Sequence, residues 1–314
     1  YAALSYCWGS SRAFTTTISS LSKRKAGFAL GNLPRTIRHA VEVAQALSIP
    51  YLWVDSLCII QDSPTDWDTE ATRMCSVYEN ALVTFAAVDS PDNRTGMFLT
   101  SESRLTKKLD LRMADGTTSS VHARISRDRE RLGIIHYNPF IQRASKTNIL
   151  ETRGWTFQEL SLSTRILWFS CDELAWSCHE IGVCECKPEP IPRSLCLSAN
   201  HNVHPNRFLA CTDDDSTSWI LEWMQIVDKF TLRHLSFQKD RLPALAGLAA
   251  AFQTRVNGLY CGGLWGLNLQ AQLLWYSDTQ PSAIDARPPM EVPVIDYAPS
   301  WSWASVSGHI MYYP

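Results

Sequence analysis

The chain has 314 residues, of which 45% are hydrophobic, enough to bury the core of one large domain or two modest ones. Its 29 Lys and Arg and 31 Asp and Glu give a net charge of −2, so no strong field attracts nucleic acid or an anionic membrane surface. The ten Cys lack the regular spacing of a disulfide framework. These features predict a cytoplasmic protein without a nucleic-acid partner.

The first ninety residues alternate between predicted strands and helices. A short apolar strand opens the chain and breaks at Gly9, and a helix with one apolar face follows over 33–48. The apolar run 51–60 predicts a strand covered on both faces, residues 63–81 predict a second helix, and 82–88 predict another buried strand. This order is typical of a parallel sheet with right-handed crossovers, in which strand ends and helix starts gather at one edge.

Later segments are more varied. Residues 100–150 predict a hairpin insertion that turns at Asp115 and Gly116, and 154–169 predict a short helix followed by a strand. Two further helices are expected, over 218–230 and 241–252.

Near the end of the chain, Trp301 and Trp303 alternate with small polar residues, which predicts a half-buried strand. The longest uncharged stretch, 256–277, contains several Asn, Gln and Gly residues and is too polar for a membrane-spanning helix. We therefore expect no membrane span.

Three polar segments should meet at the predicted sheet edge: Ser5–Gly9, Asp55–Asp62 and Trp67–Arg73. Acidic groups next to a buried strand cost free energy unless they are hydrogen-bonded, so they indicate either a site or a structural network. In the structural interpretation, Asp55 and Asp62 accept bonds from backbone amides, and Glu70 interacts favourably with its helix dipole. Both interpretations are open at this point.

The cysteines favour a structural role. Neither Cys7 nor Cys58 has a His close in sequence, so both are interpreted as small core residues rather than nucleophiles. A later cluster holds enough ligands for one zinc ion but lacks paired two-residue spacing, so we predict it to be metal-free and mostly buried. Its members are Cys171, Cys178, His179, Cys184 and Cys186.

Five sequence blocks together resemble one known family. They read YAALSYCWG, LPRTIRHAVEVAQAL, YLWVDSLCIIQD, DWDTEATRMCSVYENALVTFAA and RGWTFQELSLSTRILWFS, in this order, over roughly residues 1–170. This combination closely resembles the fungal heterokaryon incompatibility (HET) domain. The resemblance implies a fungal cytoplasmic protein whose relatives trigger cell death when genetically different hyphae fuse.

The fold expected from these observations is α/β. Residues 1–170 would form the HET domain, a TIR-like or flavodoxin-like, mostly parallel sheet flanked by helices, with the hairpin insertion at about 100–150. Residues 171–314 would form a mixed α+β extension packed on it.

The similarity of the family to TIR domains implies a chemistry, because some TIR domains cleave NAD at the nicotinamide glycosidic bond with a helix-borne Glu. Here SYCWG is similar to the end of a TIR first strand, and Trp67 with Glu70 is similar to the Trp and Glu of the catalytic helix. The spacing from Trp67 to Glu70 is one residue shorter than in the usual TIR pattern. The expected catalytic residues are Glu70, Asp55 and Asp62. The expected substrate-binding residues are Ser5, Tyr6, Cys7, Trp8, Gly9, Cys58, Gln61, Trp67, Arg73, Arg153, Gln158 and Glu159.

No cofactor is expected, since NAD or a related nucleotide would be the substrate. Two other functions fit the same sequence: a small-molecule enzyme of fungal secondary metabolism built on the HET scaffold, and a non-catalytic signalling module that self-associates as a homo-oligomer. The polar group Arg153, Gln158 and Glu159 also has a structural interpretation, as a salt-bridged joint between the N-terminal sheet and the rest of the chain.

Overall fold

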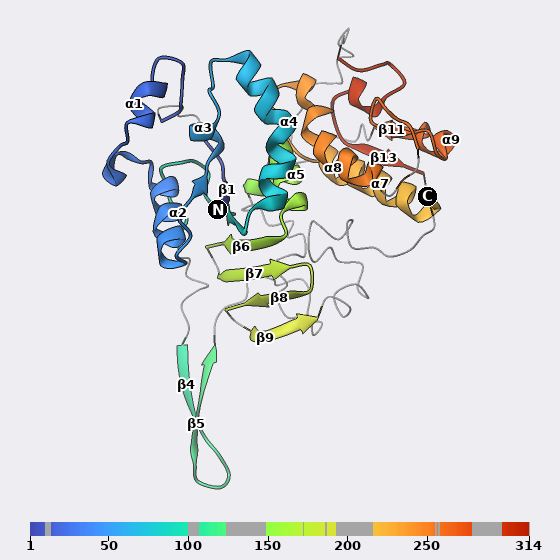
Figure 1. Ribbon diagram of the computed structural model, residues 1–314. Helices are drawn as coiled ribbons and strands as arrows, with labels where there is room; N and C mark the ends of the chain where they lie inside the picture. The colour runs from blue at the N-terminus through green and yellow to red at the C-terminus, as the bar shows by residue number, and fades with distance from the viewer. Residues whose placement is uncertain are drawn as a thin grey trace.

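A seven-stranded sheet forms the centre of the computed structural model, with strand order β2-β1-β3-β6-β7-β8-β9 (Figure 1). The structure describes residues 1–9, 14–99, 107–123, 149–171, 173–185, 187–192, 216–254, 256, 258–277 and 297–313. Four strands are mutually parallel: β1 (Ala2–Ser5), β2 (Leu52–Trp53), β3 (Val83–Ala87) and β6 (Arg165–Phe169). Three antiparallel strands extend the sheet beyond residue 170: β7 (Leu174–Cys178), β8 (Ile181–Cys184) and β9 (Lys187–Pro192).

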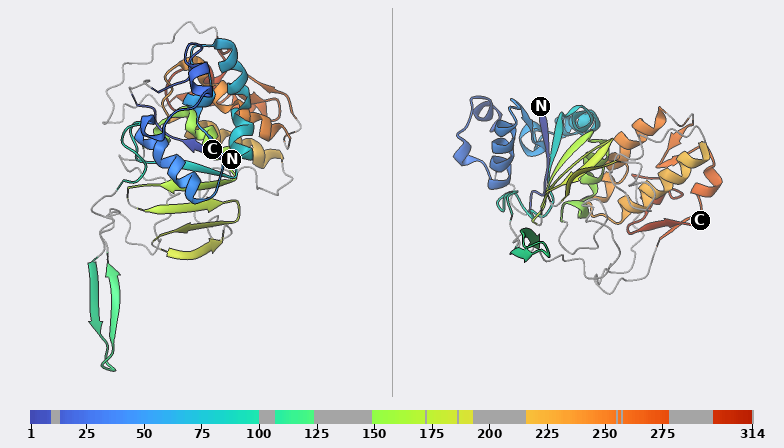
Figure 2. Two further views of the ribbon diagram at one scale, coloured as in Figure 1. Left: turned by 60° about the vertical axis from the view of Figure 1, so that its left-hand side comes forward. Right: turned by 90° about the horizontal axis from the view of Figure 1, so that it is seen from below.

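Helices cover both faces of the parallel strands (Figure 2). On one face, α2 (Arg35–Ala46) packs against Ala2 and Leu4 of β1. On the other, Ala3 contacts a core that includes α4 (Pro64–Asn80) and α5 (Gly154–Leu162). Because successive strand residues face opposite sides, a strand covered on both faces is apolar on both, as Ala2, Ala3 and Leu4 of β1 are; the last residue, Ser5, is also buried. The α/β fold with a parallel N-terminal sheet is confirmed.

The run 51–60 is not one strand. Only Leu52 and Trp53 pair with β1, and the one-turn helix α3 (Asp55–Cys58) follows directly. The apolar run misled the prediction because a short buried helix and a buried strand have the same composition. As a result, Asp55 lies at the start of a helix that leaves the sheet, instead of inside a strand.

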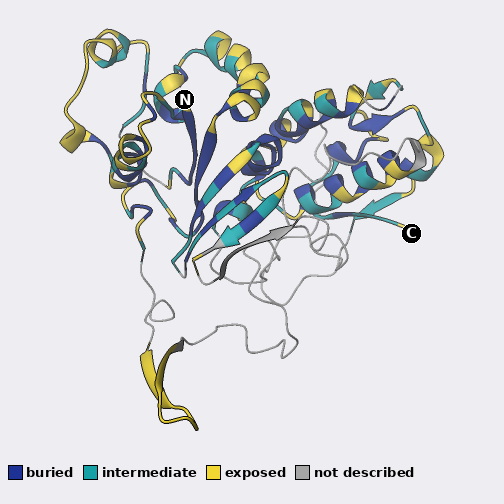
Figure 3. Cartoon of the chain, turned by 60° about the horizontal axis from the view of Figure 1, so that its bottom comes forward, coloured by how far each residue is buried: buried dark blue, intermediate teal, exposed yellow. Residues whose placement is uncertain are grey.

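The chain between the parallel strands includes three smaller elements. These are α1 (Leu21–Lys25) and the 3-10 turns η1 (Leu30–Asn32) and η3 (Leu150–Thr152). The predicted hairpin is present as β4 (Lys107–Arg112) paired with β5 (Thr118–Ala123), turning around Asp115 and Gly116. It extends away from the sheet and helices (Figures 1 and 3).

The remaining C-terminal elements form an α+β extension. The two predicted helices are confirmed as α7 (Ser216–Thr231) and α8 (Pro243–Gln253). Small elements surround them: η5 (Gln238–Asp240), α9 (Leu269–Gln272), and the antiparallel pairs β10 (Tyr260–Cys261) with β11 (Leu264–Trp265) and β12 (Trp275–Ser277) with β13 (Ile310–Tyr312). No helix in the described ranges has the length and apolarity that crossing a membrane requires.

The strand predicted at Trp301 and Trp303 is wrong. The segment bends into the 3-10 turn η6 (Trp303–Ser305), because the Ser302 hydroxyl accepts a bond from the Ala304 amide at 3.0 Å. Trp303 is fully buried and donates its indole N–H to the carbonyl of Gly263. Trp301, in the turn before it, is 42% exposed. Two tryptophans in successive turns have the same spacing as two in a strand, so the alternation could not distinguish the two structures.

Candidate functional site

The polar residues at the carboxyl ends of β1 and β2 come together around Asp55. After β1 the chain continues through Tyr6, Cys7 and Trp8, and after β2 it enters α3 at Asp55. The indole N–H of Trp8 donates to Asp55 Oδ2 at 2.7 Å, and the amide of Ser56 donates to Asp55 Oδ1 at 2.6 Å. Both carboxylate oxygens of this half-buried side chain are therefore held by donors from two different segments.

Further bonds fix the two segments to each other and to α5. Tyr6 donates its hydroxyl to Ser56 Oγ at 2.8 Å, across the gap between the β1 and β2 chain ends. The guanidinium of Arg153, which precedes α5, donates to the carbonyl of Tyr6 at 2.7 Å and interacts with the Cys7 thiol. Arg153 thereby places a positive charge beneath the outgoing end of β1.

A second carboxyl group lies deeper. Glu159, on α5, is buried and accepts a bond from the Ser5 hydroxyl at 2.6 Å. It also interacts with Tyr78 of α4, whose hydroxyl donates to the carbonyl of Leu4. We call the set formed by Ser5, Tyr6, Trp8, Asp55, Ser56, Arg153 and Glu159 the Asp55 network. Its members come from β1 and the residues after it, from α3, and from α5 and the residue before it, three segments that are far apart in sequence.

Burial shifts the pKa of both carboxyl groups upward. It raises the pKa of Asp55 to about 6, although Arg153 and the bond from Trp8 act in the opposite direction. Burial, together with the charge of Asp55, raises the pKa of Glu159 to about 7. Burial likewise raises the pKa of the Cys7 thiol, which disfavours a thiolate nucleophile at that position. Near neutral pH, the Asp55 network holds two carboxyl groups that titrate where enzymes commonly work.

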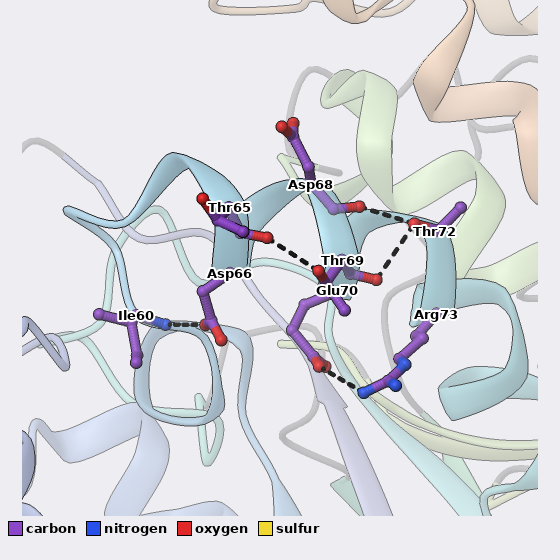
Figure 4. A network of polar contacts seen from close by, with 8 residues as sticks. All are labelled: Ile60, Thr65, Asp66, Asp68, Thr69, Glu70, Thr72 and Arg73. Atoms are coloured by element: carbon purple, nitrogen blue, oxygen red, sulfur yellow. Dashed lines mark hydrogen bonds and ion pairs between the residues drawn. The ribbon is translucent and has the colours of Figure 1, made fainter.

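Glu70 lies beside the network, on α4. The helix begins at Pro64, capped by the Ser63 hydroxyl, so Glu70 is in the second turn and not in the first as its predicted role implied. Its carboxylate pairs with Arg73 at 3.2 Å (Figure 4). The Glu70 side chain is 20% exposed and Arg73 is 68% exposed. Cys58 of α3 is exposed, so the prediction that it is a core residue is wrong. Desolvation raises the pKa of its thiol, and the charges of Asp55 and Glu70 raise it as well, so both carboxylates lie within electrostatic range of Cys58.

Other predicted site residues have structural contacts. Asp62 accepts the amide of Ile18 at 2.7 Å, and Gln61 donates to the carbonyls of Asp55 and Ile59. Trp67 packs edge-to-face on Trp155, with ring centroids 6.0 Å apart. These contacts anchor the segments that follow β2.

Gln158 and Gly9 also have structural contacts. Gln158 Oε1 accepts the amide of Gly247 in α8, which supports the joint that the sequence suggested for this block. Gly9 has a φ of +71° and is packed so closely on Asp92 that a side chain would collide with it. These two residues connect the site region to neighbouring segments.

The predicted cysteine cluster is described only in part. Cys171 and Cys178 are partly exposed free thiols rather than fully buried, and Cys186 lies outside the described residues. Among the residues that the structure describes, no three His, Cys, Asp or Glu side chains are grouped as metal ligands would be. The prediction that the cluster is metal-free is left to elemental analysis.

Sequence reasoning missed three residues that shape this region. Ser56 connects Tyr6 to the Asp55 segment, Tyr78 reaches Glu159, and Asp66 accepts the amide of Ile60 at 2.7 Å (Figure 4). In the sequence, Tyr78 falls on the apolar stripe of the helix predicted over 63–81, which predicts a core position and no more. A hydroxyl on a buried stripe residue was the available signal, because such a group must find a hydrogen-bond partner.

Comparison with known proteins identifies the N-terminal part. The family model described as heterokaryon incompatibility protein (HET) matches residues 1–159, which include every member of the Asp55 network. Neither the curated proteins nor the solved structures contain a match to this chain. Since the matched residues are more than half of the 314-residue sequence, the chain belongs to the heterokaryon incompatibility family.

Proposed function

We propose that this heterokaryon incompatibility protein hydrolyses the glycosidic bond of NAD or a related nucleotide, with Asp55 as the central carboxylate. The support is chemical. A half-buried carboxylate is fixed at the carboxyl ends of parallel strands, the location at which open α/β sheets bind ligands. The carboxyl group of Glu159 interacts electrostatically with Asp55, and so does the guanidinium of Arg153.

The reaction requires stabilisation of positive charge. When the bond between the ribose C1′ and the nicotinamide nitrogen breaks, the electron pair goes to nitrogen and the ribose becomes an oxocarbenium ion. Nicotinamide leaves as a neutral molecule, so its departure needs no proton. Water then adds to C1′, and its proton passes to a carboxylate or to solvent. A carboxylate fixed in partly dry surroundings is suited to stabilise the oxocarbenium ion and to orient the water.

Each neighbour of Asp55 has a role in this proposal. With its pKa raised to about 6, Asp55 is mostly ionised at neutral pH and still able to accept a proton. Trp8 and Ser56 orient its two oxygens. Glu70 supplies a second carboxylate from α4, and the exposed guanidinium of Arg73 is available for a phosphate group.

One observation carries the proposal: both oxygens of Asp55 are held by fixed donors while its pKa is raised by burial beside Arg153. A surface carboxylate that served only as a helix start would need neither an indole donor from another segment nor a buried cation. Perturbed titration of this kind concentrates at functional sites, although structural networks also produce it.

The test is mass spectrometry of a metabolite mixture containing NAD and ATP, before and after incubation with the purified chain. We expect NAD or a related nucleotide to fall and its free base to appear in equal amount. Asp55→Asn should slow this by at least ~100-fold, comparable to removing one electrostatic stabiliser of a transition state. Asp66→Asn is the matched control, because Asp66 also accepts a backbone amide through its carboxylate but lies outside the Asp55 network.

The outcomes separate the functions that the sequence left open. Consumption of a metabolite without a glycosidic bond would support the small-molecule enzyme instead. An unchanged mixture with folded wild-type protein would contradict catalysis and leave the signalling module.

A further inference from the structure

The hairpin β4–β5 has two chemically different faces. Residues directly opposite each other on paired strands share a face, so the register places Leu109 with Val121 and Leu111 with Ser119 on one side. Met113 continues this row towards the turn. On the other side lie Lys108, Asp110 and Arg112, with Ser120 opposite Asp110 and Thr118 opposite Arg112.

The polar face is partly held by its own contacts. Asp110 pairs with Lys108 at 3.2 Å and accepts the hydroxyl of Ser120 at 2.6 Å. The turn is also closed by its own bonds, since Asp115 accepts the amide and hydroxyl of Thr117, and Gly116 has the positive φ that such a loop needs. This face is therefore polar and faces the solvent.

The apolar face is uncovered. Leu109, Leu111, Met113 and Val121 are each between 45% and 49% exposed, and the hairpin extends away from the sheet and helices (Figures 1 and 3). A two-stranded hairpin is marginally stable by itself and usually needs its apolar side packed against another layer. Among the residues that the structure describes, no such layer covers it, since every residue of 107–121 is exposed.

We propose that this apolar face packs against the same face of a second copy of the chain. The row formed by Leu109, Leu111, Met113 and Val121 carries no charge, so two copies can meet without like-charge repulsion. If the two hairpins run antiparallel about a two-fold axis, Lys107 at the base of one approaches Asp115 at the tip of the other, which pairs opposite charges at both ends.

The size of the face sets the strength of this contact. Four half-exposed side chains per copy cover much less than the ~1,200 Å² that stable specific interfaces bury. The structure therefore assigns a weak, concentration-dependent dimer rather than a permanent one. A lipid surface is the competing occupant of this face, but six-residue strands are shorter than the 9–11 residues of a strand that crosses a membrane. This inference does not depend on the proposed hydrolase activity.

Sedimentation equilibrium of the full chain over a wide concentration range tests the contact. Leu111→Lys puts a charge on the apolar face, and Ser120→Lys puts the same charge beside Asp110 on the opposite face as a matched control. We expect the average mass of the wild type and of Ser120→Lys to rise with concentration, and dimerisation of Leu111→Lys to weaken by at least ~10-fold. Equal thermal melting of the three proteins would confirm that the folds are intact.

Several results would overturn the inference. Wild-type protein that stays monomeric at the highest concentration has no such contact, and a dimer equally strong in Leu111→Lys must use another surface. If the monomeric wild type cosediments with vesicles of anionic phospholipid and Leu111→Lys does not, the face binds lipid and not a second copy.

Discussion

The aromatic core of the C-terminal half and the edge of the parallel sheet bury different kinds of side chain. The C-terminal core contains Trp223, Trp265 and Trp303, all with no exposed surface, and the indole N–H groups of Trp223 and Trp303 both donate to the carbonyl of Gly263. The parallel sheet edge instead buries Glu159 and surrounds Asp55 with polar partners. Apolar burial stabilises the fold at any pH, whereas buried carboxyl groups oppose folding once they ionise. In the function that we propose, the sheet edge is arranged for chemistry and the aromatic core for stability.

The aromatic core should show the largest effect on stability. Trp223→Ala removes a fully buried ring that packs edge-to-face on Phe252, Tyr260 and Trp265, so we expect unfolding to become easier by about 3–5 kcal/mol. Urea unfolding followed by circular dichroism measures this change. A loss below about 1 kcal/mol would mean that this core does not support the C-terminal half.

Glu159→Gln should change how stability depends on pH. Because the pKa of Glu159 is about 7 in the folded chain against 4.5 as its ordinary value, the folded state binds the proton more tightly. The stability of the wild type should therefore fall as pH rises from about 4.5 through about 7, by an amount on the order of 2–3 kcal/mol. Gln keeps an acceptor for Ser5 but does not ionise.

Melting curves of the wild type and Glu159→Gln between pH 4 and 8.5 measure this prediction. The variant should be relatively more stable at pH 8 than at pH 4.5. Parallel pH profiles for the two proteins would contradict the raised pKa of Glu159.

A substitution at the contact between α5 and α8 should destabilise the fold less than Trp223→Ala. A Cβ at Gly247 would lie 2.8 Å from Gln158 Oε1, the atom that accepts the Gly247 amide. Gly247→Ala should destabilise the fold by about 1–3 kcal/mol through overpacking, even though Ala favours helices. Chemical unfolding decides the sign. A more stable variant would show that α5 and α8 are packed less closely than the structure has them.

The smallest effect is expected at Arg73. Its ion pair with Glu70 is on the surface, with Arg73 68% exposed, so Arg73→Ala should change the free energy of unfolding by less than about 0.5 kcal/mol. The same urea titration applies. A change above about 1 kcal/mol would place Arg73 in the structural framework instead of leaving it available for a ligand.

Sequence alone predicted the sheet, its helices and the hairpin, because these depend on apolar periodicity and on turn residues. It also predicted that the Ser5–Gly9 segment and Asp55 would share one edge, which follows from parallel topology. It could not predict that Asp55 starts a one-turn helix, since the run 51–60 is apolar whether it is a strand or a helix.

The hydrogen bond between Ser5 and Glu159 also could not be predicted from the sequence. The two residues are 154 positions apart, and only the packing of α5 under β1 brings them together. The contacts of Asp62 and Gln61 could not be predicted for a different reason. A polar side chain that bonds to backbone groups looks in sequence like one that binds a substrate.

The central claim is that Asp55 is kept for chemistry and not for stability. Thermal melting and nucleotide loss, measured side by side for the wild type, Asp55→Asn and Asp66→Asn at pH 7.5, test it most directly. We predict that Asp55→Asn loses at least ~100-fold in turnover while its melting temperature stays within a few degrees of the wild type, and that Asp66→Asn remains active. An Asp55→Asn variant that melts much earlier but turns over nucleotide at the wild-type rate would contradict the account.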